Sequence, residues 1–440
     1  MSISASREPA GRPPRARHPA FARAHSLLSH FSQLDVLMLG IWVISTTMPF
    51  GWAQPLRYIA AFYFLASMVL FARQTTPTMF RAWPTFILPV LCVVSAVWAP
   101  VASEAIRKGM LMALTAIAAI YAASRLSGRQ VLTIFLFCEG IAGLMSLVMP
   151  NPVDGAWTGI FGQKNFLSGN MAVLHVCALG VALDRGSNRL IRLGAAGLVP
   201  IAMLIIVMAK SATITMLMGV STVALLGHAM FWAPASRVRH MRTLLVMAFS
   251  ILLVAAALLV FGILRLDATE SVLGAFGKDS TLTGRTYLWS IAERIMAEKP
   301  MTGMGAEGFW RAERGAANSI TQYFFYDKYT RFSFHNSYLE NGVALGYPGY
   351  WATVVLAVWA IWRTGMNWIR NQSMVNAAFL MLAIMIVVRS NAEIDLAQEF
   401  MATAFLLFIG AARKEKLVKA PIIRQAAPMP PPHAAQRATP

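Results

Sequence analysis

The sequence predicts an all-α fold: a polytopic integral membrane protein of about twelve transmembrane helices, with one large loop that contains short helices. Two observations predict it. Of the 440 residues, 57% are hydrophobic and only 13% are charged, whereas soluble domains carry roughly 25% charged residues. The apolar residues also fall into long runs separated by short polar gaps. In lipid, the backbone amides of such a run must be satisfied within their own helix.

Twelve apolar runs are candidate spans. They cover residues 34–50, 56–72, 83–99, 109–123, 131–149, 166–183, 190–209, 212–233, 243–264, 338–361, 374–388 and 395–411. The runs 109–123, 374–388 and 395–411 fall short of the roughly 20 residues of a full span. Residues 1–33 are basic and are expected to form an uncleaved cytoplasmic tail rather than a signal peptide. Residues 412–440 are expected to form a second, Pro/Ala-rich tail.

The distribution of positive charge predicts the orientation. The formal net charge is +19. If the N-terminus is cytoplasmic, more than half of the 38 Lys and Arg residues fall in the tails and the loops on that side. The positive-inside rule then predicts that both termini are cytoplasmic. Because the charge is spread over these loops and not gathered in one groove, nucleic acid is excluded as a partner.

One loop is far longer than a connector. Residues 265–337 occupy 73 positions between two predicted spans, on the outer side. Within it, Thr286–Ala297 carries apolar residues at helical spacing and is expected to form an amphipathic helix near the membrane surface. The predicted organisation is therefore spans 1–9 over 34–264, the outer loop over 265–337, and spans 10–12 over 338–411.

The cysteines are not candidates for a metal site, a disulfide or a nucleophile. All three lie inside apolar runs, where cysteine behaves as a small buried hydrophobe. No spacing matches a metal site or a disulfide framework.

Six basic residues stand at the outer boundary, against the charge bias. They are Arg57, Arg107, Lys108, Lys164, Lys210 and Arg389. Each could be an anchor whose charge reaches the interface. Together they suit an anion at the outer leaflet, because Lys and Arg hold phosphate oxygens by charge-assisted hydrogen bonds.

Three of the candidate positions have local features of their own. The segment 159–165 follows a helix-breaking stretch and is expected to form a re-entrant turn, with Lys164 beside a helix N-terminus that attracts anions. Lys210 precedes Ser211 between two spans with almost no linker. Arg285, after Gly284, opens the amphipathic helix, where its charge opposes the helix dipole. Anion binding would explain the position of Arg285. For Lys164 the alternative is a plain extracellular turn, and for Lys210 it is an interfacial anchor.

Two motifs lie in the second half of the loop. Residues 300–305, Pro-Met-Thr-Gly-Met-Gly, predict a tight turn but not a phosphate-binding loop, because no Gly-Lys-Ser/Thr follows. His335-Asn336 stands directly before the span that starts at Tyr338. A neutral histidine can accept a proton at ambient pH, although a single histidine at a membrane surface is more often structural.

The order of these features resembles the O-antigen ligase and Wzy-type polymerase superfamily, and within it the ExoQ-type exopolysaccharide polymerases. The resemblance covers residues 150–350. It implies a membrane glycosyltransferase of the bacterial inner membrane, whose large loop is periplasmic. The donor is then an undecaprenyl-pyrophosphate-linked glycan, and neither a metal nor another cofactor is needed.

The resemblance also implies roles for individual residues. His335 activates the acceptor hydroxyl and Arg285 binds the pyrophosphate, so both are candidate catalytic residues. Lys164 and Lys210 match outer-face basic positions of the family. Arg107 and Arg389, basic at the outer boundary, and Asn336, beside His335, complete the set of candidate substrate-binding residues. Membrane lipid is a partner, and a chain-length regulator and export machinery stay open as partners. The reaction expected from these roles is an inverting displacement at the anomeric carbon.

Two positions depart from the family pattern. Gln163 stands where related proteins often carry His, and Ala344 stands where many carry an acidic residue. Glu340, one turn before Ala344, is the candidate to fill that acidic role.

Three other functions stay open. The first is a ligase that moves the finished glycan onto lipid A core or a protein. The second is a transporter or flippase of lipid-linked sugars, which the scarcity of ionisable residues within the spans disfavours. The third is a sensor or scaffold, which leaves the outward basic residues unexplained.

Overall fold

A computed structural model describes residues 19–232, 240, 244, 247, 284–310, 315–324, 332–396 and 399–415, with side chains from residue 32 onward. Within these residues the regular secondary structure is helical apart from one short β-hairpin, which confirms the all-α class. The predicted span 243–264 lies almost wholly outside the described residues, as do most of the two predicted tails and the loop residues 265–283.

The helices before the long loop are α1 Pro19–Thr47, α2 Gln54–Leu70, α3 Ala72–Arg81, α4 Ile87–Val94, α5 Ala102–Arg125, α6 Gly128–Val148, α7 Lys164–Leu183, α8 Arg189–Met208 and α9 Ala212–Gly227. The strands are β1 Pro152–Val153 and β2 Ala156–Trp157. The later helices are α13 Arg285–Glu298, α14 Gly315–Tyr323, α15 Ser337–Arg370, α16 Met374–Arg389 and α17 Ala402–Ala412.

Eleven of the twelve predicted spans coincide with these helices, but fewer are long enough to cross a membrane. Among the described residues, seven helices have the required length and apolarity, or eight if α3 and the helical stretch Trp83–Val97, bent by 83°, count as one span. The apolar helices Ser32–Thr47, Met374–Arg389 and Ala402–Ala412 are shorter. The predicted run 109–123 was too short for a full span, but it belongs to α5, which has 24 residues and is long enough. A count of twelve spans is not confirmed.

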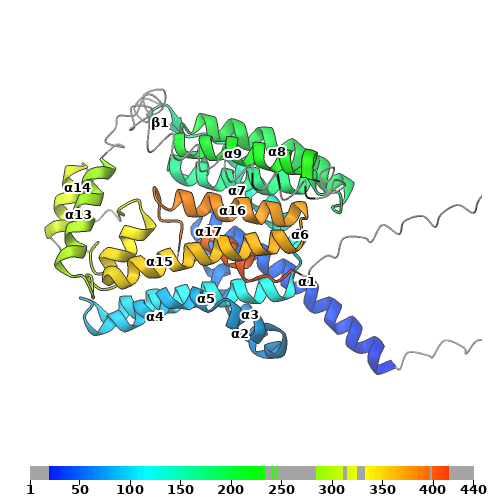
Figure 1. The fold of residues 1–440 in the computed structure, drawn as a ribbon, viewed down its shortest axis with the longest axis horizontal. Coiled ribbons are helices and arrows are strands. Elements are labelled where there is room, and N and C mark those ends of the chain that lie inside the picture. Colours follow the sequence, from blue (N-terminus) through cyan, green and yellow to red (C-terminus); the bar gives the residue numbers. More distant parts are fainter. Residues whose placement is uncertain are drawn as a thin grey trace, which may run out of the picture.

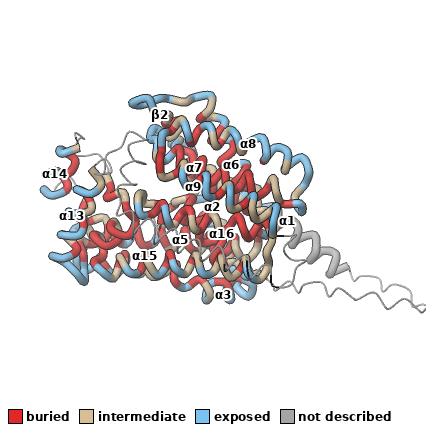
Figure 2. The backbone as a smooth tube through the Cα atoms, turned by 45° about the horizontal axis from the view of Figure 1, so that its top comes forward, coloured by how far each residue is buried: buried red, intermediate tan, exposed pale blue. Residues whose placement is uncertain are grey.

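The long helices pack side by side with their axes roughly along the long axis of the molecule (Figure 1). In that view α7, α8 and α9 form a layer above α15 and α16, and α4 and α5 lie below. The core between these layers is apolar and closely packed, and α7 is buried along most of its length (Figure 2). By contrast, α8 and α9 are largely exposed outside it, as expected for helices that face lipid.

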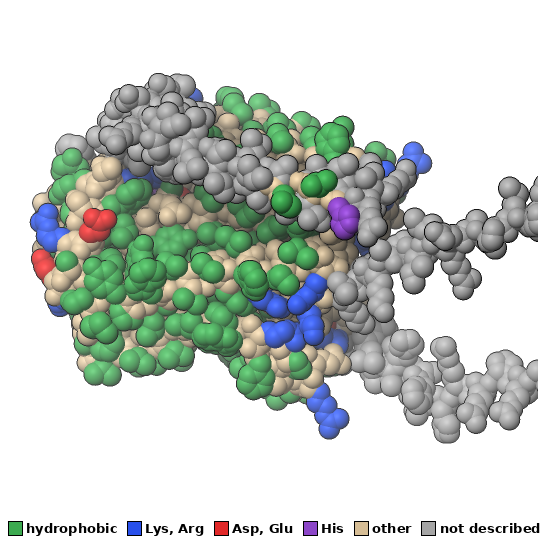
Figure 3. Space-filling model, viewed as in Figure 1, with side chains coloured by type: hydrophobic (Ala, Val, Ile, Leu, Met, Phe, Trp, Pro, Cys, Tyr) green, Lys and Arg blue, Asp and Glu red, His purple; other side chains and the backbone are tan. Residues whose placement is uncertain are grey.

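Polar groups gather at the two ends of the bundle. Figure 3 shows hydrophobic side chains across the middle of the visible face, with charged side chains toward its left and right margins. We call the end that carries α13 and the β-hairpin the site end. At the opposite end Arg129 pairs with Asp184 at 2.6 Å, and Arg363 donates to the carbonyl of Ala411. The basic residues predicted to lie on opposite faces of the membrane are thus separated in the structure.

Three helices start in short polar turns, and their first residues explain why. Side-chain oxygens of Ser127, Asn188 and Ser373 accept hydrogen bonds from backbone amides in the first turns of α6, α8 and α16. Such caps satisfy amides that have no partner within the helix. All three capped turns join helices at the opposite end.

The site end contains a hairpin that was not predicted from the sequence. Strands β1 and β2 pair antiparallel around Asp154-Gly155, and both turn residues have positive φ. An Asp-Gly pair favours this two-residue turn because both positions require left-handed backbone. A short 3-10 turn, Gly159–Phe161, follows and leads into α7. The segment predicted as a re-entrant turn is thus a 3-10 turn with a hairpin before it.

The glycine turn at 300–305 fits into a kink of α15. That kink lies at Gly346, whose φ is 70°, two residues before Pro348. The amide of Met304 donates to the carbonyl of Val343 at 2.8 Å, and the amide of Tyr347 donates to the carbonyl of Pro300 at 2.7 Å. The turn therefore joins the loop to the first third of α15, just after the segment that carries His335.

The predicted amphipathic helix exists as α13, but its apolar face packs on protein. Leu288, Ala292 and Met296 are buried against a second cluster of apolar side chains that includes Phe334 and Leu339. This contact holds the start of α13 close to the start of α15. The first residues of the two elements are Arg285 and Ser337, so the packing brings Arg285 and His335 to the same place.

Candidate active site

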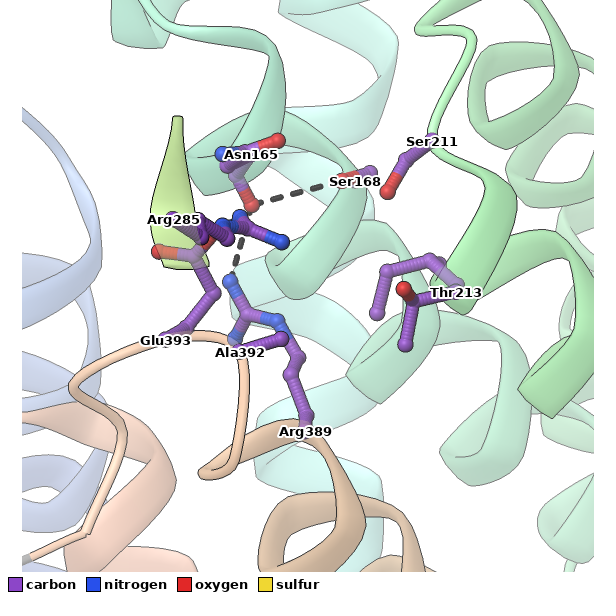
Figure 4. A pocket seen from close by; sticks show the side chains of 9 residues that line it. Asn165, Ser168, Ser211, Thr213, Arg285, Arg389, Ala392 and Glu393 are labelled. Carbon is purple, nitrogen blue, oxygen red and sulfur yellow. Dashed lines mark hydrogen bonds and ion pairs between the residues drawn. The ribbon is translucent and has the colours of Figure 1, made fainter. Parts of the chain in front are cut away.

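A small polar pocket opens at the site end, between α7, α9, α13 and α16 (Figure 4). It is lined by Asn165, Ser168, Ser211, Thr213, Ile214, Arg285, Arg389, Ala392 and Glu393. Two guanidinium groups, hydroxyl groups and an amide thus face one small space, and such groups bind phosphate oxygens. The pocket is therefore suited to a compact polar group, such as a phosphate, and not to a whole oligosaccharide.

Arg285 is held at the pocket by the turn before it. Gly284 adopts φ 82° at the N-cap of α13, a conformation that glycine adopts without strain. The Arg285 guanidinium, 15% exposed, donates from Nη2 to Oε1 of Glu393 at 2.7 Å. The unfavourable placement of a cation at a helix N-terminus is therefore balanced by an acidic partner 108 residues later in the chain.

His335 faces the same carboxylate. It has φ 50° and precedes the N-cap of α15. Its Nδ1 lies 3.1 Å from Oε2 of Glu393, and its side chain is 28% exposed. Because a carboxylate only accepts, Nδ1 carries the proton of a neutral His335 and Nε2 is free to accept one. Within the described residues, this geometry orients the imidazole ring of His335 and leaves Nε2 as the nitrogen that can accept a proton.

Asn336 has a structural task beside His335. Its side-chain oxygen accepts from the amides of Tyr338 and Leu339 at 3.0 and 3.1 Å, so it caps α15. The adjacent Ser337 bonds through its amide to the carbonyl of Ser390 and through its hydroxyl to the carbonyl of Glu393, each at 2.8 Å. These bonds join the start of α15 to the segment 390–401, between α16 and α17.

Glu393 was not singled out from the sequence, and it is the residue that links Arg285 to His335. Burial raises its pKa, but the hydrogen bond from His335 and the charges of His335, Arg389 and Arg285 lower the pKa below the ordinary value of 4.5. The carboxylate is therefore ionised at neutral pH. A signal was present, since residues 389–395 place three charged side chains at the end of an apolar run.

Arg389 lies deeper in the pocket wall. Its Nη2 donates to the carbonyl of Asn165 at 2.8 Å (Figure 4). Its Nη1 donates to Oδ2 of Asp395 at 2.6 Å. Its side chain is 8% exposed. A buried guanidinium requires such partners, and the bond to Asn165 places it beside the first turn of α7.

The remaining candidate cations do not line the pocket. Lys164 and Lys210 are exposed residues at its rim, directly before the lining residues Asn165 and Ser211. Arg107 is on α5 and pairs with Glu104 at 2.8 Å and with Glu399 at 3.9 Å.

Glu340 contacts the loop and not the histidine. Its two oxygens accept from Nε1 of Trp310 at 2.8 Å and from the amide of Phe334 at 2.9 Å. The acidic group beside His335 is therefore Glu393. The role of Glu340 as the acid in place of the one missing at Ala344 stays a prediction.

The fold and the pocket define a multi-pass helical membrane protein with a polar, arginine-lined site at one end of its bundle. Residues 195–354 match the O-antigen ligase family. The chain is also 24% identical over 386 residues, 86% of both chains, to the exopolysaccharide production protein ExoQ of Rhizobium meliloti (strain 1021). Both comparisons confirm the predicted resemblance to O-antigen ligases and to ExoQ-type proteins.

The matched region includes Arg285 and His335 but ends before Arg389 and Glu393. Sequence motifs within it could therefore indicate only half of the site. Asn165, Ser168, Arg389 and Glu393 lie outside the matched region and join the site through tertiary contacts.

Proposed function

We propose that this chain polymerises undecaprenyl-pyrophosphate-linked oligosaccharide repeat units into exopolysaccharide, at the periplasmic face of the bacterial inner membrane. The observation that carries the proposal is that Arg285 and His335 both contact Glu393, which lines the pocket together with Arg285. These are a phosphate-binding cation, a base and a carboxylate that orients the base. The family match supports a glycosyl transferase of the polymerase or ligase kind, and the name of the R. meliloti relative favours exopolysaccharide as the product.

The proposed reaction needs few groups. The periplasm lacks nucleotide sugars, so the donor must carry its own leaving group. A lipid pyrophosphate departs as an anion and requires cations to stabilise its developing charge. Arg285 and Arg389 would face it in the pocket, with Lys164 and Lys210 at the rim. His335 Nε2 would take the proton of the acceptor hydroxyl, and attack on the face opposite the leaving group would invert the anomeric carbon.

Arg107 and Asn336 have less direct roles in the proposed reaction. Arg107 would meet the lipid-linked substrate outside the pocket, near α5. Asn336 would act through the start of α15, which it caps, and so through the position of His335.

The family description also favours a second function, a ligase that transfers the same donor to lipid A core. One experiment separates the two. The purified protein is incubated with its host's lipid-linked repeat unit, first without and then with lipid A core, and the products are resolved by size. A ladder of lengthening lipid-linked glycans is expected without core. Transfer only after core is added would establish a ligase, and no covalent product in either case would favour a transporter.

Variants assign the site in the same assay. His335→Ala and Arg285→Ala should each lower the rate by about 100-fold or more, the usual contribution of a general base or an electrostatic donor. Arg294→Ala changes another basic residue of α13, exposed and away from the pocket, and should leave the rate within about twofold. Retention of activity in His335→Ala would remove the histidine from the role of base.

A further inference from the structure

One carboxylate serves two partners in the candidate site. Oε1 of Glu393 accepts from Arg285 Nη2 at 2.7 Å, and Oε2 lies 3.1 Å from Nδ1 of His335. The three residues come from α13, from the turn before α15 and from the segment 390–401. All are largely buried, with side chains between 14% and 28% exposed. A single negative charge is therefore divided between the group proposed to hold the donor and the group proposed to act as base.

The arginines of the pocket already have acidic partners. Arg389 pairs with Asp395, bonds the carbonyl of Asn165 and is 8% exposed. Within the described part of the chain, the Arg285 guanidinium bonds to Glu393 alone and is about twice as exposed. An entering phosphate must compete with these carboxylates. Arg285 can exchange its partner at lower cost, because fewer of its bonds must break and its charge lies nearer to water.

We infer that Glu393 couples donor binding to the activation of His335. This inference rests on the proposed function. When the donor pyrophosphate takes the Arg285 guanidinium, Oε1 of Glu393 loses its cationic partner. The charge of the carboxylate then acts on the imidazole and stabilises the imidazolium that forms during the reaction. The charges that face Glu393 are those of Arg285, His335, Arg389 and Asp395, and in this exchange only the position of Arg285 changes.

The chemical step balances with these groups. The acceptor O–H proton moves to Nε2 of His335 while the acceptor oxygen forms a bond to the anomeric carbon. The bond from that carbon to the phosphate oxygen breaks, and the lipid pyrophosphate leaves with the electron pair. Nδ1–H remains hydrogen-bonded to Glu393 throughout. Without donor, Arg285 holds part of the carboxylate's charge and the base is weaker, which disfavours proton transfer in an empty site.

This coupling predicts effects of opposite sign in one variant. Glu393→Gln keeps the size of the side chain and an oxygen that can accept from His335, but it removes the charge. Because Arg285 is then free, farnesyl pyrophosphate, a short lipid pyrophosphate, should bind about tenfold more tightly, the size expected when one charge-assisted hydrogen bond no longer competes. Because the imidazolium loses its counter-charge, kcat should fall about 100-fold.

Two further variants separate the effect of the Glu393 charge from nonspecific effects of substitution. Glu393→Asp retains the charge on a shorter side chain and should restore part of kcat while the affinity for farnesyl pyrophosphate returns toward wild type. Glu293→Gln makes the same chemical change at an exposed position of α13 and should alter neither quantity.

The experiment uses the full-length protein in lipid nanodiscs, with the Kd for farnesyl pyrophosphate from calorimetry and kcat from the glycan-transfer assay. Tighter binding together with slower turnover in Glu393→Gln supports the coupling. Parallel weakening of both would show that Glu393 is only structural, and unchanged binding would show that it does not compete for Arg285; either result overturns the inference. If wild type makes no glycan product, the proposed function fails, and the binding measurement still decides whether Glu393 and pyrophosphate compete.

Discussion

Gly169 and Arg389 are packed directly against each other at the base of the pocket. A Cβ atom added at Gly169 would meet the guanidinium carbon and both terminal nitrogens of Arg389. The guanidinium therefore crosses α7 at the one turn where no side chain stands in its way, which allows it to reach the carbonyl of Asn165.

Gly169→Ala should impair the site more than the fold. The obstructed atoms are the end of a flexible side chain, so Arg389 can move aside, but it then loses the geometry of its bonds to Asp395 and Asn165. We expect transfer to slow about 10- to 100-fold, as for other small displacements of a binding group, with thermal stability lowered by about 1–3 kcal/mol at most. Gly194→Ala is the control, since its Cβ would enter open space on α8. Equal activity of both variants would contradict a role for the Arg389 position.

The pair formed by Lys108 and Glu307 should be important for stability. Lys108 Nζ lies 2.6 Å from Oε1 of Glu307, and the two side chains are 8% and 20% exposed. The pair joins α5 to the loop that follows α13. Lys108→Met should destabilise the protein by about 3–5 kcal/mol, because it removes the cation of a largely buried ion pair.

The double variant Lys108→Met, Glu307→Gln distinguishes pairing from packing. Removal of both charges should recover much of the lost stability. Thermal unfolding in detergent measures each variant. A double variant as unstable as the sum of its single changes would mean that the two residues act independently.

Gly346 should be intolerant of a side chain. A Cβ atom there would lie 2.5 Å from the carbonyl oxygen of Pro300, and its φ of 70° is strained for other residues. Since the obstacle is backbone, no rotamer relieves it, and the turn at 300–305 must leave the kink. Gly346→Ala should lower the yield of monodisperse protein severalfold and the thermal midpoint by several degrees. Gly365→Ala, in the same helix with its nearest contact at 4.0 Å, should behave as wild type.

Acid should weaken the site through Glu393. Its pKa is lower in the folded protein than its ordinary value of 4.5, so the stabilisation from its ion pairs is fully present above that value. This stabilisation is lost as the pH falls through the lowered folded pKa, where the carboxylate gains a proton. The stability difference between wild type and Glu393→Gln should therefore be full above about pH 4.5 and shrink as the pH falls below it. Thermal unfolding across this range measures it, and a constant difference would contradict an ion-pair role.

The separation of basic residues between the two ends of the bundle was predictable, because it follows from how membrane helices insert. Arg285 was also predictable as a candidate, since helix stability did not explain its position. His335 was predictable because it stands in the outer loop directly before a span and matches a family motif. Arg389 was recognised as a cation against the charge bias, but nothing in the sequence indicated that Asp395 and Asn165 would hold it. Lys164 and Lys210 were expected at the site and instead occupy its rim, because their neighbours Asn165 and Ser211 point inward.

The sequence by itself determined that the chain is helical and embedded in a membrane, because apolar length and charge bias act through the solvent and need no tertiary contact. It also predicted that the loop 265–337 contributes Arg285 and His335 to the candidate site. Only the tertiary structure decided that Glu393, 58 residues after His335, is the acid beside the histidine. That pairing depends on the kink at Gly346, on the turn at 300–305 that fills it, and on the bonds from Ser337 to the segment 390–401. Such contacts join residues far apart in the chain, so no pattern of residue spacing in the sequence indicates them.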